Sequence, residues 1–468
     1  MSSEPLAATC WSEELRATHL ALSAADLKFR ELALQSPALL RRSTFRAFDA
    51  ASRIFDPKQP WPTFIGGDKL ARLKRLSLEV AALIRSLPRR VFANHPARIC
   101  EYYDLPSQDA VAIMLAEPSG IAESMGRGDV IDTADGFKCI EFNFGARLGG
   151  WEHGLLAELQ EKIPETAGFL EREGIRCSYT PTLRLLFEQM ISLARRQRLC
   201  ERGELNVACA LHPDDIDRPM HQESIAILQR ELERSCRNAM PPLSGKVVAC
   251  HYGQLAAAQG RLFHREIQVH AVLELCARHA PPAVYRLFKA GRLLLFNGPI
   301  DDVLRDKRNL ALLSLHESSN LFSPREQEVI RTYVPWTRLV RAEPVRFGGE
   351  EVFLPDLLVS GRERLVLKQA MGHGGSGVFL GRWTGVARWE ELVRSSLATG
   401  GWVVQEHLES LPYLYQSGEY GCEAHDVVWG PFVFGSTFGG VVLRMQPQAA
   451  GGPVNLSLAA REGLVLEV

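Results

Sequence analysis

Two carboxylates, an arginine and an asparagine lie close together in a short segment with the pattern of a β-hairpin. Residues 127–143 place Asp135-Gly136 between two apolar-rich runs, of which the first contains Asp129 and the second Glu141. Asp-Gly between such runs is a strong hairpin signal. Carboxylate and amide oxygens are ligands that suit Mg²⁺. The segment therefore predicts a hairpin that collects metal-ligating side chains at one place.

The length of the turn decides which side chains share a face. With a three-residue loop, Ala134–Gly136, Asp129 lies opposite Glu141 and Arg127 opposite Asn143, and directly opposed residues point the same way. With a two-residue turn, Asp129 and Glu141 point apart. An ordinary surface hairpin with solvated charges is the alternative to both arrangements.

We favour the three-residue loop for two further reasons. It sends Val130, Ile140 and Phe142 together to the opposite face, and it pairs Asp132 with Lys138 across the strands. One buried face and one chemical face result.

Composition sets broad limits on the rest of the chain. The 468 residues are 46% hydrophobic and 23% charged, with a formal net charge of -1 and no long basic block, so we expect neither a nucleic-acid nor a membrane partner. No run of eighteen or more apolar residues occurs, the N-terminus lacks a signal-peptide pattern, and the ten cysteines form no Cys-x-x-Cys pair. A cytoplasmic protein with mostly structural thiols is expected.

A glycine-rich segment is the second candidate site. Lys368 ends an apolar run, and a Gly-x-Gly-x-x-Gly pattern follows over residues 372–377. A dinucleotide fingerprint must open a helix, whereas Val378-Phe-Leu continues as a strand, so we predict a glycine-rich hairpin tip. Its backbone N–H groups can approach a polyphosphate while Lys368 supplies positive charge. A plain turn is the alternative.

Two further segments fit the same chemistry. Lys307 stands near the start of a helix predicted over residues 304–313, where an ammonium can reach a phosphate, although this segment taken alone favours a salt-bridged surface. The apolar run at residues 401–406 predicts a strand that ends in Gln405 and Glu406. Such a strand can offer backbone groups to an adenine and a side chain to its amino group.

The elements around these segments indicate a mixed α+β and α/β chain. Residues 12–87 have helical apolar spacing, interrupted by a turn-rich block at 56–67. Between 170 and 300, strands alternate with helices, which favours a largely parallel sheet. There we predict strands at 206–212 and 245–250, with helices at 223–235 and 272–279. A helix is also expected at 388–398, and strands are expected at 426–435, 439–444 and around 454–456.

Together these segments resemble the circularly permuted ATP-grasp family, and most closely the synthetase portion of glutathionylspermidine synthetase. The hairpin is similar to that family's metal-binding hairpin, and the segments at Lys307 and Lys368 resemble its two nucleotide lysines. In unpermuted chains the Glu-x-Asn element follows the lysines, whereas here it precedes them. The resemblance covers residue 98 to the C-terminus.

The resemblance implies a set of site residues. It implies that Mg²⁺ is held by Asp129, Glu141 and Asn143, and that Arg127 and Arg444 are catalytic. For ATP it implies the following contacts: Lys307, Lys368, Gly372, Gly374, Gly375, Ser376, Gly377, Gln405, Glu406 and Leu408. Substrate contacts are expected from Arg147 and the loop to Glu152, while Arg444 and Asn455 have structural roles as an alternative.

The resemblance also implies a domain order and an activity. The order is a helical N-terminal region (1–98), a first ATP-grasp segment (99–168), a Rossmann-like pre-ATP-grasp domain (169–300) and a second ATP-grasp segment (301–468). The implied enzyme is an ATP-dependent carboxylate-amine ligase that forms an amide through an acyl phosphate. A phosphotransferase and a catalytically silent nucleotide-binding module are the alternatives. Small-molecule carboxylates and amines are the expected partners, and a homodimer is one candidate assembly.

Overall fold

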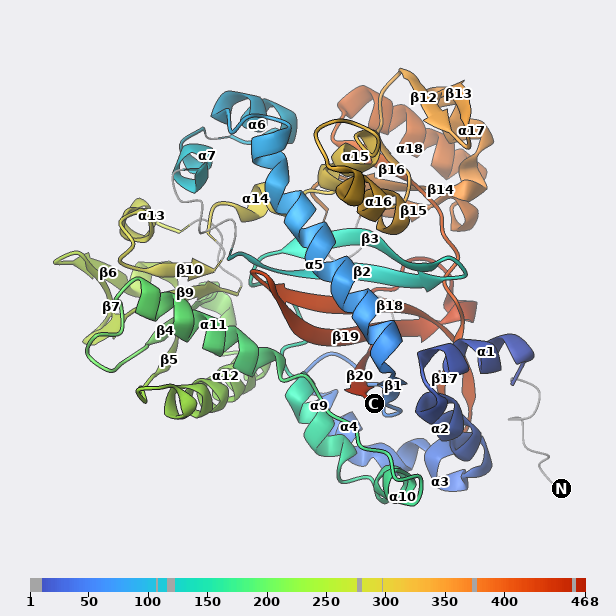
Figure 1. Ribbon diagram of the computed structural model, residues 1–468, viewed down its shortest axis with the longest axis horizontal. Coiled ribbons are helices and arrows are strands. Elements are labelled where there is room, and N and C mark those ends of the chain that lie inside the picture. Colours follow the sequence, from blue (N-terminus) through green and yellow to red (C-terminus); the bar gives the residue numbers. More distant parts are fainter. Residues whose placement is uncertain are drawn as a thin grey trace.

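The computed structural model describes residues 11–106, 108–115, 123–275, 280–296, 298–372, 377–456 and 460–468, and it is a mixed α/β structure (Figure 1). Its largest sheet has seven strands in the order β1-β20-β19-β18-β2-β3, with β17 also paired to β18. The strands are β1 (Thr63–Ile65), β2 (Met125–Thr133), β3 (Gly136–Phe144), β17 (Tyr413–Gln416), β18 (Cys422–Phe434), β19 (Thr437–Pro447) and β20 (Arg461–Glu467).

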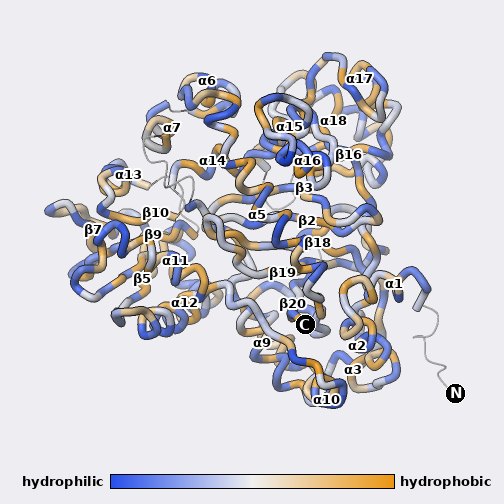
Figure 2. Tube along the Cα trace, in the orientation of Figure 1, coloured by the Kyte–Doolittle hydropathy of each residue, from blue (hydrophilic) through white to orange (hydrophobic). Residues whose placement is uncertain are grey.

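Helices from the N-terminal region cover one side of this sheet. The long helix α5 (Gly67–Arg90) runs across β2, β3, β18 and β19. In Figure 2, hydrophobic and hydrophilic residues alternate along α5, as expected for a helix with one buried face. The other N-terminal helices are α1 (Glu13–Leu22), α2 (Ala24–Gln35), α3 (Pro37–Leu40), α4 (Arg46–Ala51), α6 (Pro96–Tyr103) and α7 (Gln108–Leu115).

An α/β unit with a parallel sheet follows the hairpin, as predicted. Its strands have the order β10-β9-β4-β5, and all three pairings are parallel. They are β4 (Val207–Ala210), β5 (Val247–Cys250), β9 (Ala271–Glu274) and β10 (Leu294–Phe296), beside a small antiparallel sheet of β6 (Leu255–Ala258), β7 (Arg261–His264) and β8 (Ile267–Val269). The helices of this unit are α11 (Thr182–Arg196), α12 (Pro219–Asn238) and α13 (Pro282–Lys289), whereas the preceding α9 (His153–Gln160) and α10 (Pro164–Arg172) lie with the central sheet, where α9 contacts β20 and α4.

One prediction in this unit was wrong. A helix was expected over residues 272–279, but residues 271–274 form β9, the buried strand between β4 and β10. A short apolar run has the same composition in a buried strand and in a buried helix, so periodicity alone could not separate them. Residues 276–279 lie outside the described residues.

The last unit has a four-stranded antiparallel sheet in the order β11-β16-β14-β15. The strands are β11 (Thr337–Leu339), β14 (Leu365–Gln369), β15 (Val378–Leu380) and β16 (Trp402–Glu406), with a separate ribbon of β12 (Pro344–Phe347) and β13 (Glu350–Phe353). Its helices are α14 (Asp301–Leu304), α15 (Arg308–Leu315), α16 (Pro324–Tyr333), α17 (Leu354–Ser360) and α18 (Val386–Thr399). The helix expected over 304–313 is divided between α14 and α15, and Lys307 directly precedes α15. Residues 454–456, expected in a strand, are irregular.

The hairpin has the predicted pairing at Asp129 and Arg127, but its turn is shorter than predicted and it contains a β-bulge. Asp129 pairs with Glu141 and Arg127 with Asn143, as expected. The turn has only two residues, because Thr133 pairs with Gly136, and a β-bulge places one extra residue, Ile140, between the partners of Asp129 and Val130. The three-residue loop was therefore wrong, and the bulge restores the register that such a loop would have given.

The bulge also changes two side-chain predictions. Ile140 lines a cavity instead of joining Val130 and Phe142 in the core. Asp132 pairs with Phe137 instead of Lys138, and its buried carboxylate accepts hydrogen bonds from Lys69 and Tyr413. Lys138 donates to the carbonyl of Thr332.

A buried polar cluster joins the N-terminal helices to the central sheet. His19 Nδ1 lies 2.5 Å from Asp26 Oδ2, and His19 Nε2 accepts the backbone N–H of Leu414 at 2.9 Å. The Nε2 lone pair is therefore in use, which places the ring proton on Nδ1. Burial lowers the pKa of His19, although Asp26 opposes this shift.

Among the described residues, no helix combines the length and apolar character needed to cross a bilayer.

We expect this cluster to make the protein less stable in mild acid. The pKa of His19 is lower in the folded than in the unfolded chain, so its contribution is complete above the unfolded value of 6.5 and is lost as the pH falls below it. Protonation of Nε2 would break the bond from Leu414. His19→Gln should lower stability at pH 7 by about 1–3 kcal/mol and should reduce the loss between pH 7 and pH 5. Urea unfolding at both values measures this.

His212→Gln is the matched control, because the His212 side chain is exposed. It should keep the wild-type dependence on pH. An equal loss of stability between pH 7 and pH 5 in wild type and His19→Gln would contradict the assignment.

Candidate functional site

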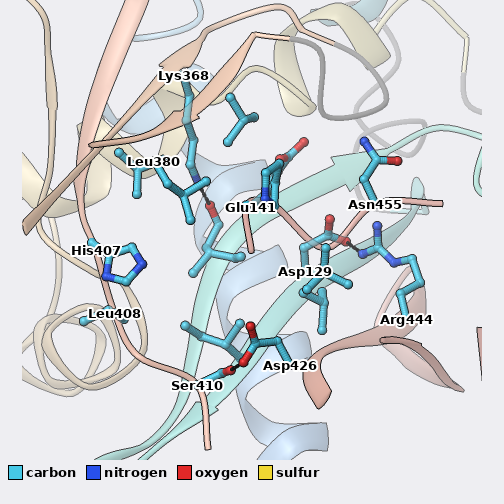
Figure 3. A pocket seen from close by; sticks show the side chains of 18 of the residues that line it. Asp129, Glu141, Lys368, Leu380, His407, Leu408, Ser410, Asp426, Arg444 and Asn455 are labelled. Atoms are coloured by element: carbon cyan, nitrogen blue, oxygen red, sulfur yellow. Dashed lines mark hydrogen bonds and ion pairs between the residues drawn. The ribbon is translucent and has the colours of Figure 1, made fainter. Parts of the chain in front are cut away.

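A cavity of about 840 Å³ lies between the central sheet and the four-stranded antiparallel sheet (Figure 3). Its walls come from segments far apart in the sequence: the hairpin β2–β3, the loop after it, β14, β15, the end of β16, β18, β19 and residues 452–456. Two sequence-predicted groups, the hairpin and the Lys368 segment, therefore meet at one place.

The chemical face of the hairpin lines this cavity. Arg127, Asp129, Glu141 and Asn143 all contribute to its wall. They are two directly opposed pairs on neighbouring strands, and opposed residues share a face. Gly430 on β18 leaves room for the arginine, because a Cβ at this position would lie 3.0 Å from Arg127 Cδ.

Asp129 is held between two arginines. Arg444 Nη2 lies 2.6 Å from Asp129 Oδ1, and Arg127 Nε lies 3.8 Å from the same oxygen. Burial would raise the pKa of Asp129, but Arg444 and Arg127 outweigh it and lower that pKa. Burial, together with the nearby Arg444, lowers the pKa of Arg127 to about 10. At neutral pH these three groups are all charged, and Asp129 Oδ2 has no partner among the described residues.

Lys307 reaches the other carboxylate of the hairpin. Its Nζ lies 3.3 Å from Glu141 Oε1 and donates to the carbonyl of Gly372 at 3.1 Å. The lysine is 6% exposed. The alternative of a solvated surface salt bridge is therefore excluded for Lys307, and the basic residue beside it, Arg308, pairs with Asp306 and Asp104.

Lys368 is fixed by the bulge and by β16. Its Nζ donates to the carbonyl of Ile140, the extra residue of the bulge, at 2.9 Å and to Gln405 Oε1 at 2.7 Å. Burial lowers the pKa of Lys368 to about 8, with Lys307 contributing in the same direction and Glu141 opposing it. The bulge therefore points a backbone carbonyl at the lysine while its neighbour Glu141 stays on the cavity wall.

The end of β16 forms the wall beside Lys368. The Gln405 amide is committed to Lys368 and, through Nε2, to Thr337, and the Glu406 carboxylate accepts the backbone N–H of Trp336 at 2.8 Å. The backbone N–H of Leu408 makes no hydrogen bond to any described residue, and Leu408 lines the cavity. Of the three ATP contacts predicted here, Gln405, Glu406 and Leu408, only Leu408 has a backbone N–H without a partner among the described residues.

The strands on either side of the glycine-rich segment, β14 and β15, pair antiparallel, as predicted for a hairpin. Gly377 has a φ of +82°, and a Cβ there would lie 2.5 Å from Gln369 Oε1. A side chain at this position would have to displace the Gln369 side chain, and the positive φ by itself favours glycine. Gly374, Gly375 and Ser376 lie outside the described residues, and Gly372 meets Lys307 through its carbonyl.

The remaining predicted contacts divide into two groups. Arg147 and Asn455 line the cavity, the latter near Arg444. Glu152 instead turns away into a buried pair with Lys58. Sequence reasoning missed several wall residues, including Asp56, Trp383 and Asp426. Of these, only Asp426 could have been found from the sequence, because it places a charge at an inward-facing position of strand β18.

A magnesium ion fits the hairpin in part. Across the described part of the chain, no group of three or more histidine, cysteine, aspartate or glutamate side chains forms a metal cluster. Magnesium in phosphate-transfer sites, however, needs only one or two carboxylates and takes its other ligands from phosphates and water. Asp129 and Glu141, with Asn143 beside them, satisfy this smaller requirement.

No protein-family model matches the chain, and no curated protein matches it. The geometry of the cavity is therefore the basis for assigning a function.

Proposed function

We propose that the protein is an ATP-dependent carboxylate-amine ligase that forms an amide through an acyl phosphate. One observation carries the proposal. Seven side chains from five separate segments come together: Arg127, Asp129, Glu141, Asn143, Lys368 and Arg444 line one cavity, and Lys307 reaches Glu141 on its wall. Within this group four cations stand beside two anions, a local excess of positive charge that suits a polyphosphate. Elsewhere the cavity wall carries further charges of both signs, with the carboxylates Glu14, Asp56, Glu406, Glu409 and Asp426 beside Arg147 and Arg382.

The residues divide naturally between the two ends of a nucleotide. Lys307 and Lys368 would hold phosphate groups, and the backbone N–H of Leu408 would donate to the adenine ring. Asp129, Glu141 and Asn143 would hold Mg²⁺, which neutralises charge on phosphate oxygens when bound. The glycine-rich tip would cover the phosphates and exclude water from the acyl phosphate.

Arg127 and Arg444 would stabilise the groups that change charge. In the first step an oxygen of the substrate carboxylate bonds to the γ-phosphorus, and ADP leaves with the electron pair of the broken bond. In the second step the amine nitrogen bonds to the carbonyl carbon, phosphate leaves, and the nitrogen loses a proton. Both steps place negative charge on oxygens, which buried guanidinium groups stabilise.

The test is a screen of carboxylates and amines for stimulated ADP release with ATP and Mg²⁺. A substrate carboxylate labelled with ¹⁸O should transfer one labelled oxygen to the released phosphate, and mass spectrometry should find a new amide. A stable phosphorylated product formed without amine would replace the ligase with a phosphotransferase. Nucleotide binding without any ADP release across the screen would leave only the binding module.

A further inference from the structure

A lysine from the N-terminal region lies buried beside the arginine end of the cavity. Lys58 precedes β1, and its side chain is 0% exposed. The backbone places it there, because Gln59 N donates to the carbonyl of Glu462 at 2.7 Å and Glu462 N donates to that of Pro57 at 2.8 Å. Residues 57–59 therefore lie alongside the start of β20, ahead of β1, with Lys58 directly beside Glu462.

The Lys58 ammonium joins two segments that are far apart in the sequence, the loop that ends at Glu152 and strand β20. It donates to Glu152 Oε1 at 2.5 Å and also to Glu462 Oε2. Glu152 ends the loop that follows the metal hairpin, whereas Glu462 belongs to β20. The ammonium therefore fastens this loop to the edge of the central sheet.

Each of these two elements contacts an arginine of the site. In the loop, the carbonyl of Gly149 accepts a hydrogen bond from Arg127 Nη1 at 2.8 Å. In the sheet, Glu462 lies directly opposite Arg444, which forms the ion pair with Asp129. Opposed residues share a face, so Glu462 lies on the same face of the sheet as Arg444.

We propose that Lys58 is a positioning residue, which fixes the loop at residues 149–152 and through it the guanidinium of Arg127. This inference rests on the proposed function for its consequence in catalysis, although the arrangement itself can be tested without any substrate. Lys58, Glu152 and Glu462 affect one another's charge. Burial and the neighbouring Glu152 raise the pKa of Glu462, whereas Lys58 outweighs burial and lowers the pKa of Glu152.

Two matched variants separate a positioning role from a structural one. Glu152→Met and Glu462→Met each remove one carboxylate and leave Lys58 with one partner, but only the first releases the loop. In crystals without ligand, Glu152→Met should break the contact between Arg127 and Gly149, and Glu462→Met should keep it. Turnover per folded molecule should fall by about 10²-fold in Glu152→Met, with little change in KM for ATP, and should stay within a few-fold of wild type in Glu462→Met.

Lys58→Met should displace Arg127 as Glu152→Met does, and Lys58→Arg should restore its position. Lys28→Met is the surface control, because Lys28 pairs with Glu173 in an exposed ion pair. An unmoved Arg127 in Glu152→Met, or equal effects of Glu152→Met and Glu462→Met, would overturn the inference. If Arg127 moves as expected in a protein that forms neither ADP nor amide, the proposed function fails while the arrangement stands.

Discussion

Asp129→Asn should lower Mg²⁺-dependent ADP formation by about 10²–10³-fold. The substitution keeps the size of the side chain but removes the charge that would hold the metal, and it leaves Arg127 and Arg444 without their shared anion. Loss of one such electrostatic group costs about 10²–10³-fold in turnover. Initial rates of ADP release at saturating ATP over a range of Mg²⁺ concentrations measure the effect, and circular dichroism checks the fold.

Asp135→Asn is the control within the same hairpin. Asp135 is exposed at the tip of the turn, so the substitution removes an equal charge from the same element without touching the cavity. It should retain wild-type rates. Near-normal turnover in Asp129→Asn, or an equal loss in both variants, would reject the hairpin as the metal site.

Lys368→Met should lower kcat/KM for ATP by about 10²–10³-fold. The ammonium is buried, and it projects from β14 into the cavity between the bulge and Gln405, where water screens its charge weakly. Removing it takes one cation from the end of the cavity proposed for phosphates, and it also removes the hydrogen bond to the Ile140 carbonyl. Steady-state kinetics measure the loss in kcat/KM, and direct titration of ATP measures the loss in affinity.

The same lysine should give kcat/KM an alkaline limb. Its pKa of about 8 means that the ammonium is charged below pH 8 and neutral above it, so kcat/KM for ATP should fall as the pH rises past this value. Lys368→Arg should be less active but should lack the limb, because arginine stays charged. Lys138→Ala is the control, since Lys138 only reaches the carbonyl of Thr332 at the surface. A limb that persists in Lys368→Arg would assign the titration to another group.

The hairpin shows how far sequence reasoning could reach. Alternation of side chains predicted that Asp129 and Glu141 share a face, and the structure confirms it. The sequence could not show which turn the hairpin uses, because a two-residue turn with a bulge and a three-residue loop give the same register near Asp129. Only their consequences near the tip differ, and there the pairing of Asp132 with Lys138 was wrong.

The remaining parts of the site differ in how local their signals are. The strands around Lys368 and the tip at Gly377 follow from local pattern, because glycine and apolar alternation act within a few residues. Lys58 gave no such signal. It lies in a turn-rich block, and its role depends on Glu152 and Glu462, of which the latter is about four hundred residues away. Long-range pairing of this kind is set by tertiary packing, which no local pattern records.

The pairing of β1 with β20 has a consequence for how the protein is made. These strands come from opposite ends of the described chain, and they are parallel neighbours in the central sheet. During synthesis, residues 57–65 leave the ribosome early and have no strand partner until residues 461–467 follow. Contacts of such long range close slowly. The newly made segment at residues 57–65 therefore waits until about four hundred further residues have been made before Lys58 is buried against Glu462. During this period the unfinished sheet has an unpaired edge that is open to other chains.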